Sequence, residues 1–140
     1  YWTTIDKSAA LAKGLRVIQS TYWYLDQMHP GSGNHYFFQD TWQDFYKVDL
    51  LKGVDSKQRS LVLGGGACQW GEWVYQSSIE QHMYPRALAI SEVLWSNPQK
   101  REITPEVIER LDSLGCKLYQ SGLKVGALDS GRPCLGYPDK

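Results

Sequence analysis

The sequence predicts an α/β fold with a parallel sheet, and three observations support this prediction. Segments typical of strands alternate with segments typical of helices, which is the pattern of strands joined by helical crossovers. Both apolar strand segments end in loops that carry Trp, Tyr, Asp and Glu side chains, and α/β sheets bind ligands beyond the carboxyl ends of their strands. The connection between these strands is about forty residues long and irregular, and such long loops are usually functional.

The N-terminal half is expected to contain one helix and the first strand. Residues 6–14 are rich in alanine, begin with an acidic side chain and end at Gly14, which together favour a helix. Residues 15–20 are a short segment typical of a strand. The loop that follows, residues 29–47, is rich in glycine, histidine and aromatic side chains, and residues 41–46 predict one short helical turn within it.

The second strand and a helix follow. Residues 55–59 lead into a strand over residues 60–63, which ends in a glycine-rich bend. A single helix is predicted over residues 78–95. Its expected apolar face consists of Ala87, Ile90, Leu94 and Trp95.

A last helix is predicted from its end signals. Thr104 is the expected cap, Pro105 takes the first helical position, and Gly122 ends the helix. Its expected buried stripe consists of Val107, Leu111, Leu114 and Leu118.

Two architectures accommodate these elements. A (β/α)8 barrel needs about 250 residues, so this chain would supply about three of the eight strands, with Tyr1 and Trp2 as the tip of the first. A short open sheet is the self-sufficient alternative, but it leaves an edge beside residues 60–63 that needs cover.

Composition excludes several classes of function. Among the 140 residues, 15 basic and 15 acidic side chains cancel, so the chain has no electrostatic footprint for nucleic acid or an anionic membrane surface. Six Trp and nine Tyr are typical of cores and interfaces, but also of carbohydrate sites. No stretch approaches the length of a membrane span, and no signal peptide is visible. The start at Tyr1 rather than Met is consistent with a processed or truncated polypeptide.

Cysteine and histidine spacing gives no indication of a metal site, and we expect no cofactor. No Cys-x-x-Cys or His-x-x-x-His pair occurs, and the three histidines are scattered. Cys116 and Cys134 flank a loop, and a bridge between them would pin the C-terminal tail to a helix. Three buried thiols in a cytosolic protein are the alternative.

Residues 61–73 contain the most informative pair of side chains. Trp70 and Glu72 stand two positions apart after the glycine bend. An indole can stack on the C–H face of a sugar, and a carboxylate can accept two hydroxyl hydrogen bonds. A buried tryptophan beside a solvated glutamate explains the same pair equally well.

Four blocks occur in a fixed order: residues 20–26 (Ser-Thr-Tyr-Trp-Tyr-Leu-Asp), 42–46, 64–72 and 85–97. They resemble the conserved segments of the β-N-acetylhexosaminidases of glycoside hydrolase family 20. The resemblance covers nearly the whole chain. It implies the C-terminal part, about strands six to eight, of a (β/α)8 TIM barrel, followed by a C-terminal helix.

The resemblance implies a retaining exo-glycosidase that uses its substrate's own 2-acetamido oxygen as nucleophile and forms an oxazolinium intermediate. Tyr24 would be catalytic, donating a hydrogen bond to that oxygen, while Asp26 and Glu72 would accept from the 4- and 6-hydroxyls. Trp70 and Trp2 would form walls of the pocket. The implied substrates are glycans, glycolipids or chitooligosaccharides ending in GlcNAc or GalNAc. A core tyrosine at position 24 and a loop cap at Asp26 are the alternatives.

Other residues of these blocks are assigned to structure. Trp23 alternates to the face opposite Tyr24 and is expected to pack. Arg86 and Glu92 are expected to form a structural ion pair or helix-end contacts. The remaining tryptophans assigned to packing are Trp42, Trp73 and Trp95.

The resemblance also bears on the cysteines. In lysosomal-type members two cysteines form a disulfide across the C-terminal tail, and Cys116 and Cys134 fall in the matching places. This implies that bridge, an oxidising compartment (lysosomal or secreted), and Cys68 as a buried free thiol. A homodimer of the parent protein is compatible with the sequence.

The chain also departs from the family pattern. The segment His-x-Gly-Gly-Asp-Glu, whose glutamate is the general acid, has no counterpart here, so this segment alone is not expected to hydrolyse glycosides. Gly66 stands where the family has glutamate, and Val93 where it has arginine. A catalytically inactive relative that binds N-acetylated sugars, or a non-functional fragment, are the alternatives to part of an active enzyme.

Overall fold

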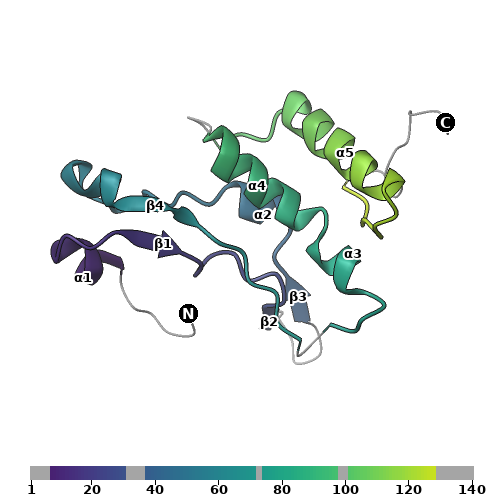
Figure 1. Ribbon diagram of the computed structural model, residues 1–140, viewed down its shortest axis with the longest axis horizontal. Helices are drawn as coiled ribbons and strands as arrows, with labels where there is room; N and C mark the ends of the chain where they lie inside the picture. The colour runs from purple at the N-terminus through teal and green to yellow at the C-terminus, as the bar shows by residue number, and fades with distance from the viewer. Residues whose placement is uncertain (1–6, 31–36, 72–73, 98–100, 129–140) are drawn as a thin grey trace.

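The computed structural model describes residues 7–30, 37–71, 74–97 and 101–128. These residues form a small α/β arrangement in which helices cover one side of a pair of parallel strands (Figure 1). The elements are α1 (Lys7–Ala12), β1 (Val17–Gln19), β2 (Met28–Pro30), β3 (Phe37–Gln39), α2 (Trp42–Tyr46), the 3-10 helix η1 (Ser56–Leu61), β4 (Val62–Gly65), α3 (Ile79–Met83), α4 (Arg86–Ser96) and α5 (Pro105–Gln120).

The predicted parallel pairing is confirmed: β1 lies beside β4 with Val17 opposite Val62 and Gln19 opposite Gly65. The second strand, however, begins two residues later than the sequence suggested. The Asp55 side chain accepts a hydrogen bond from the Lys57 amide and starts a 3-10 helix that continues to Leu61. The strand therefore occupies the first part of the glycine bend.

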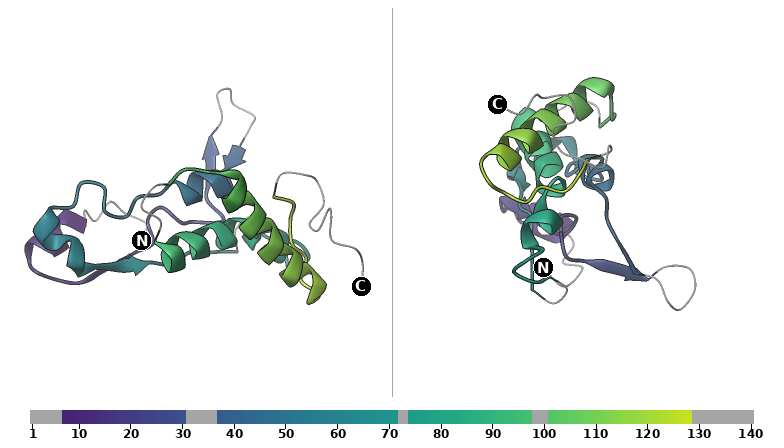
Figure 2. Two further views of the ribbon diagram at one scale, coloured as in Figure 1. Left: turned by 90° about the horizontal axis from the view of Figure 1, so that it is seen from above. Right: turned by 90° about the vertical axis from the view of Figure 1, so that its right-hand side faces the viewer.

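The core lies between this pair of strands and the helices. Helix α4 runs along β4, α2 packs against α4, and α5 lies on the far side of α4 from the strands (Figures 1 and 2). A buried cluster fills the space between them, with Trp23, Phe45 and Tyr46 almost fully enclosed. Within the described part of the chain, no helix has both the length and the apolar character that crossing a membrane requires.

The prediction of a single helix over residues 78–95 is wrong, because two helices, α3 and α4, lie on either side of Pro85. Proline has no amide hydrogen to donate to the preceding turn. Helix α4 ends at Asn97, which has a left-handed backbone. Its expected apolar face needs one correction: Trp95 is 90 % exposed and packs against none of the core.

The expected buried stripe of α5 is wrong at Leu114, which is 40 % exposed. The buried face is turned toward Gly115. A Cβ atom at Gly115 would lie 3.6 Å from Val125 and 3.7 Å from Leu88, so the glycine lets α5 approach both. The expected ends are confirmed, with Pro105 in the first turn and Gly122 at positive φ after the helix.

The connection over residues 29–47 has more order than expected. Strands β2 and β3 pair antiparallel, Met28 opposite Gln39, and project from the rest of the molecule (Figure 2). The expected helical turn is confirmed as α2. Thr41 and Asp44 form a reciprocal capping box at its start, which fixes the direction in which the chain leaves β3.

Candidate functional site

The segments that follow β1 and β4 pair again at Tyr24 and Cys68. The Leu25 amide donates to the Cys68 carbonyl (2.8 Å), and the Cys68 amide donates to the Trp23 carbonyl (2.8 Å). This isolated parallel bridge sets Tyr24 beside Cys68. The loops that carry the predicted site residues therefore leave the sheet at one edge, beyond its carboxyl end.

Trp23 and Tyr24 differ in burial, as the predicted alternation requires. Trp23 is fully buried and donates its indole N–H to the Phe45 carbonyl at 3.2 Å. Tyr24 is partly exposed. A Cβ atom at Gly65 would stand 2.3 Å from the Trp23 ring, so the glycine run gives the indole its place against β4.

Asp26 lies just past the bridge, in a turn that the Gln27 amide closes onto the Tyr24 carbonyl (3.4 Å). The side chain is 6 % exposed. Its Oδ1 atom has no hydrogen-bond partner among the described residues. A buried acceptor without a donor costs free energy, so the position suits a residue that meets its donor in a ligand.

Trp70 lies two residues past Cys68 and is 48 % exposed, so the interpretation of a buried tryptophan does not hold at this position. Cys68 is a free thiol, but it is partly rather than fully buried. Trp2 and Glu72, the other predicted sugar contacts, lie outside the described residues.

The two charged residues of the fourth block have structural contacts, but not with each other. Glu92 pairs with Arg110 of α5, Nη2 to Oε1 at 2.7 Å, and so links α4 to α5. Arg86 is 8 % exposed and bonds the last turn of α3 through the His82 carbonyl. The helix-end contact is therefore confirmed for Arg86, and the ion pair between Arg86 and Glu92 is not formed.

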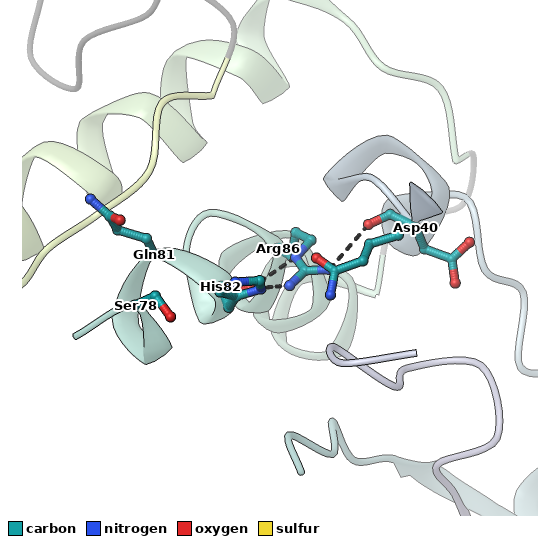
Figure 3. Close-up of a pocket in the computed structure, with 6 residues that line it drawn as sticks. Asp40, Ser78, Gln81, His82 and Arg86 are labelled. Carbon is teal, nitrogen blue, oxygen red and sulfur yellow. Dashed lines mark hydrogen bonds between the residues drawn. The ribbon is translucent and has the colours of Figure 1, made fainter. Parts of the chain in front are cut away.

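Sequence reasoning missed a polar cavity of about 270 Å³ between α3 and the start of α2 (Figure 3). Burial lowers the pKa of Arg86, while the charges of Asp40 and Asp26 act in the opposite direction. The only signal in the sequence was an arginine on an otherwise apolar helix face. The cavity is lined by Gln39, Asp40, Ser78, Gln81, His82 and Arg86.

The remaining predictions concern cysteines and metals. Cys116 is 3 % exposed in α5, while Cys134 lies outside the described residues, so their bridge stays a prediction. Of the residues described, no three His, Cys, Asp or Glu side chains are grouped so that they could hold a metal ion.

Comparison with known proteins adds an independent line of evidence. The model of the glycosyl hydrolase family 20 catalytic domain matches residues 1–98. Beta-hexosaminidase subunit A2 of Dictyostelium discoideum is 38 % identical over 130 residues, which cover 91 % of this chain and 24 % of that protein. Beta-hexosaminidase subunit beta of Homo sapiens is 36 % identical (90 % and 21 % covered), and beta-hexosaminidase 3 of Arabidopsis thaliana is 40 % identical (86 % and 21 %).

The chain thus spans less than a quarter of the length of these relatives. The family match covers well over half of the chain, including all four blocks and the whole of α4. The chain belongs to glycosyl hydrolase family 20.

Proposed function

We propose that this chain is the C-terminal portion of the (β/α)8 catalytic barrel of a retaining exo-β-N-acetylhexosaminidase. In this proposal β1 and β4 are the seventh and eighth barrel strands, and residues 1–140 form one incomplete portion of that domain. The activity would be removal of terminal GlcNAc or GalNAc from glycans, glycolipids or chitooligosaccharides.

The observation that carries the proposal is the bridge between Tyr24 and Cys68. It brings a tyrosine, a buried aspartate and an exposed tryptophan from two distant segments to the carboxyl edge of the sheet. Family membership supplies the reaction class, and the chemistry of these three side chains fits a sugar that carries an acetamido group.

In the proposed reaction the acetamido oxygen attacks the anomeric carbon while the glycosidic C–O bond breaks. The leaving oxygen takes a proton from a general acid that this segment does not contain. Tyr24 donates its phenolic hydrogen to the acetamido oxygen, which orients that oxygen before the attack. Water then opens the oxazolinium ring and gives a product with retained configuration.

The other side chains would hold the terminal sugar. Asp26 presents a buried acceptor oxygen that has no donor among the described residues, which suits a sugar hydroxyl. Trp70 exposes nearly half of its surface, enough for an indole face to cover a pyranose ring. Glu72 and Trp2 would complete the contacts on the strength of the family pattern.

The disulfide and the compartment belong to the same proposal. A Cys116–Cys134 bridge closes a loop that would stabilise the fold by about 3 kcal/mol in the chain-entropy model, and it implies a lysosomal or secreted protein. Alkylation of the unfolded, unreduced protein, mapped by peptide mass spectrometry, is expected to label Cys68 and to leave Cys116 and Cys134 unlabelled. Labelling of all three would contradict the bridge and the compartment inferred from it.

The proposed activity is tested with two chromogenic substrates that differ only in the acetamido group. The natural-length polypeptide is expected to hydrolyse the N-acetyl-β-glucosaminide and to leave the β-glucoside intact, because the second substrate lacks the nucleophile. Equal hydrolysis of both would contradict the mechanism. No hydrolysis, with thermal stabilisation by N-acetylglucosamine, would identify an inactive sugar-binding relative instead.

A further inference from the structure

Arg86 is a buried cation whose hydrogen bonds go to carbonyl groups. Its Nε donates to the His82 carbonyl at 2.9 Å, Nη2 donates to the same oxygen, and Nη1 donates to the Asp40 carbonyl at 3.3 Å (Figure 3). The guanidinium also lies 6.0 Å from the centroid of the Phe45 ring. These contacts fix the position of the charge, but carbonyl dipoles do not neutralise it.

Two carboxylates stand where the β2–β3 hairpin joins the body of the molecule. Asp40 follows β3 directly, and Asp26 precedes β2 by two residues. Because Met28 is opposite Gln39 in the antiparallel pair, both aspartates lie at the open end of the hairpin. The bond from Arg86 to the Asp40 carbonyl brings the guanidinium to the same end.

The charges of Arg86, Asp40 and Asp26 interact across this junction. Asp40 and Asp26 raise the pKa of Arg86 against the lowering by burial. Electrostatic attraction is mutual, so the guanidinium also attracts both carboxylates toward this junction. The neighbouring cavity is lined by both Asp40 and Arg86. The charge of Arg86 therefore already has acidic partners within the protein, Asp40 at the cavity and Asp26 at the base of the hairpin.

We propose that Arg86 is a positioning residue for the sugar site. It ties the base of the β2–β3 hairpin to the end of α3, and its charge attracts the Asp26 carboxylate and holds that side chain where it can accept a sugar hydroxyl. This inference rests on the proposed function, because it assigns Arg86 a role through Asp26.

The test separates the charge of Arg86 from its hydrogen bonds. Arg86→Lys keeps the charge and loses the forked contact, whereas Arg86→Gln keeps donor groups and loses the charge. In the natural-length polypeptide, KM for the chromogenic N-acetylglucosaminide is expected to rise about tenfold in Arg86→Gln and less than about threefold in Arg86→Lys. Arg110→Met, a surface variant on α5, is the control and should leave KM within about twofold.

A double-mutant cycle with Asp26→Asn then shows whether Arg86 acts through the aspartate. Once Asp26 is uncharged, Arg86→Gln is expected to change KM by less than about twofold. An undiminished tenfold effect in that background would overturn the inference while leaving the proposed function standing. The inference would also be overturned if Arg86→Lys folds, judged by its thermal unfolding, and raises KM as much as Arg86→Gln does. Should Arg86→Gln fail to fold, Arg86→Lys decides alone: a rise in KM of less than about threefold supports the inference, and a rise of about tenfold overturns it.

Failure of the proposed function would look different. If Asp26→Asn by itself leaves KM unchanged, Asp26 does not contact the sugar, and both the site and the inference built on it are overturned.

Discussion

The two faces of the β1–β4 pair differ sharply in their surroundings. On the face toward the helices, Trp23 is fully enclosed and Gln19 is 8 % exposed. On the opposite face Ile18 is 68 % exposed and Leu63 is 55 % exposed, and Tyr24 lies partly open nearby. Because successive residues of an extended segment alternate between its two faces, a core residue, Trp23, directly precedes the proposed catalytic residue, Tyr24.

The proposed barrel explains why one face of the strand pair is exposed in this segment. There the residues opposite the helices would point into the barrel interior, where apolar side chains from other strands fill the centre. Ile18 and Leu63 suit such an interior, whereas Tyr24 lies further toward the carboxyl end, where barrel enzymes place their active sites. The comparison therefore predicts stability effects on the helix side and catalytic effects on the other.

The largest stability effect is expected at Trp23. Trp23→Ala should lower the free energy of unfolding by about 3–5 kcal/mol, since it empties the centre of the core and removes the bond to the Phe45 carbonyl. Urea unfolding of the natural-length polypeptide measures this. Trp95→Ala, on a side chain that is 90 % exposed, is the matched control and should cost less than about 0.5 kcal/mol. Equal losses for the two tryptophans would refute the assignment of the faces.

A smaller loss is expected where β4 contacts the Trp23 ring. Gly65→Ala should destabilise the fold by about 1–3 kcal/mol, because the new methyl group would stand 2.3 Å from the ring and 2.6 Å from the Gln19 carbonyl. Gly66→Ala meets only the Ser20 hydroxyl, at 3.6 Å, and serves as the control in the same unfolding experiment. Equal free energies of unfolding for Gly65→Ala and Gly66→Ala would contradict the close approach of β4 to the Trp23 ring.

The smallest effect concerns the helix cap on the packed side. Thr41→Ala removes the hydroxyl that accepts from the Asp44 amide and should cost about 1 kcal/mol. Thr41→Ser keeps the hydroxyl and is expected to retain most of that stability. A comparison of the two melting temperatures checks the capping box, and a serine variant as unstable as the alanine variant would count against it.

Much of the fold follows from local signals in the sequence. The parallel pairing, the short helix α2 and the start of α5 at Pro105 were predictable, because end signals and periodicity act within a few residues. The predicted cap at Thr104 makes no side-chain capping hydrogen bond to the helix start. The break at Pro85 had its signal in the sequence, but the apolar periodicity on either side obscured it. The rotation of the α5 face toward Gly115 depends on contacts with Leu88 and Val125, which no local pattern reveals.

The site was predictable to a similar degree. The difference in burial between Trp23 and Tyr24 follows from strand alternation, and the structure confirms it. The role of Arg86 could not be foreseen, because its partners are carbonyl groups, one of them 46 positions away in the chain. A backbone carbonyl has the same chemistry at every residue, so sequence patterns do not single out such partners.

The measurement that tests the central claim most directly is the turnover of Tyr24→Phe in the natural-length polypeptide. The account predicts that kcat for the N-acetyl-β-glucosaminide falls about a hundredfold to a thousandfold, because a donor to the developing oxazolinium is lost, while urea unfolding stays within about 0.5 kcal/mol of the parent protein. Unchanged turnover in a correctly folded variant would contradict the assignment of Tyr24, and with it the claim that the open face of the sheet carries the chemistry.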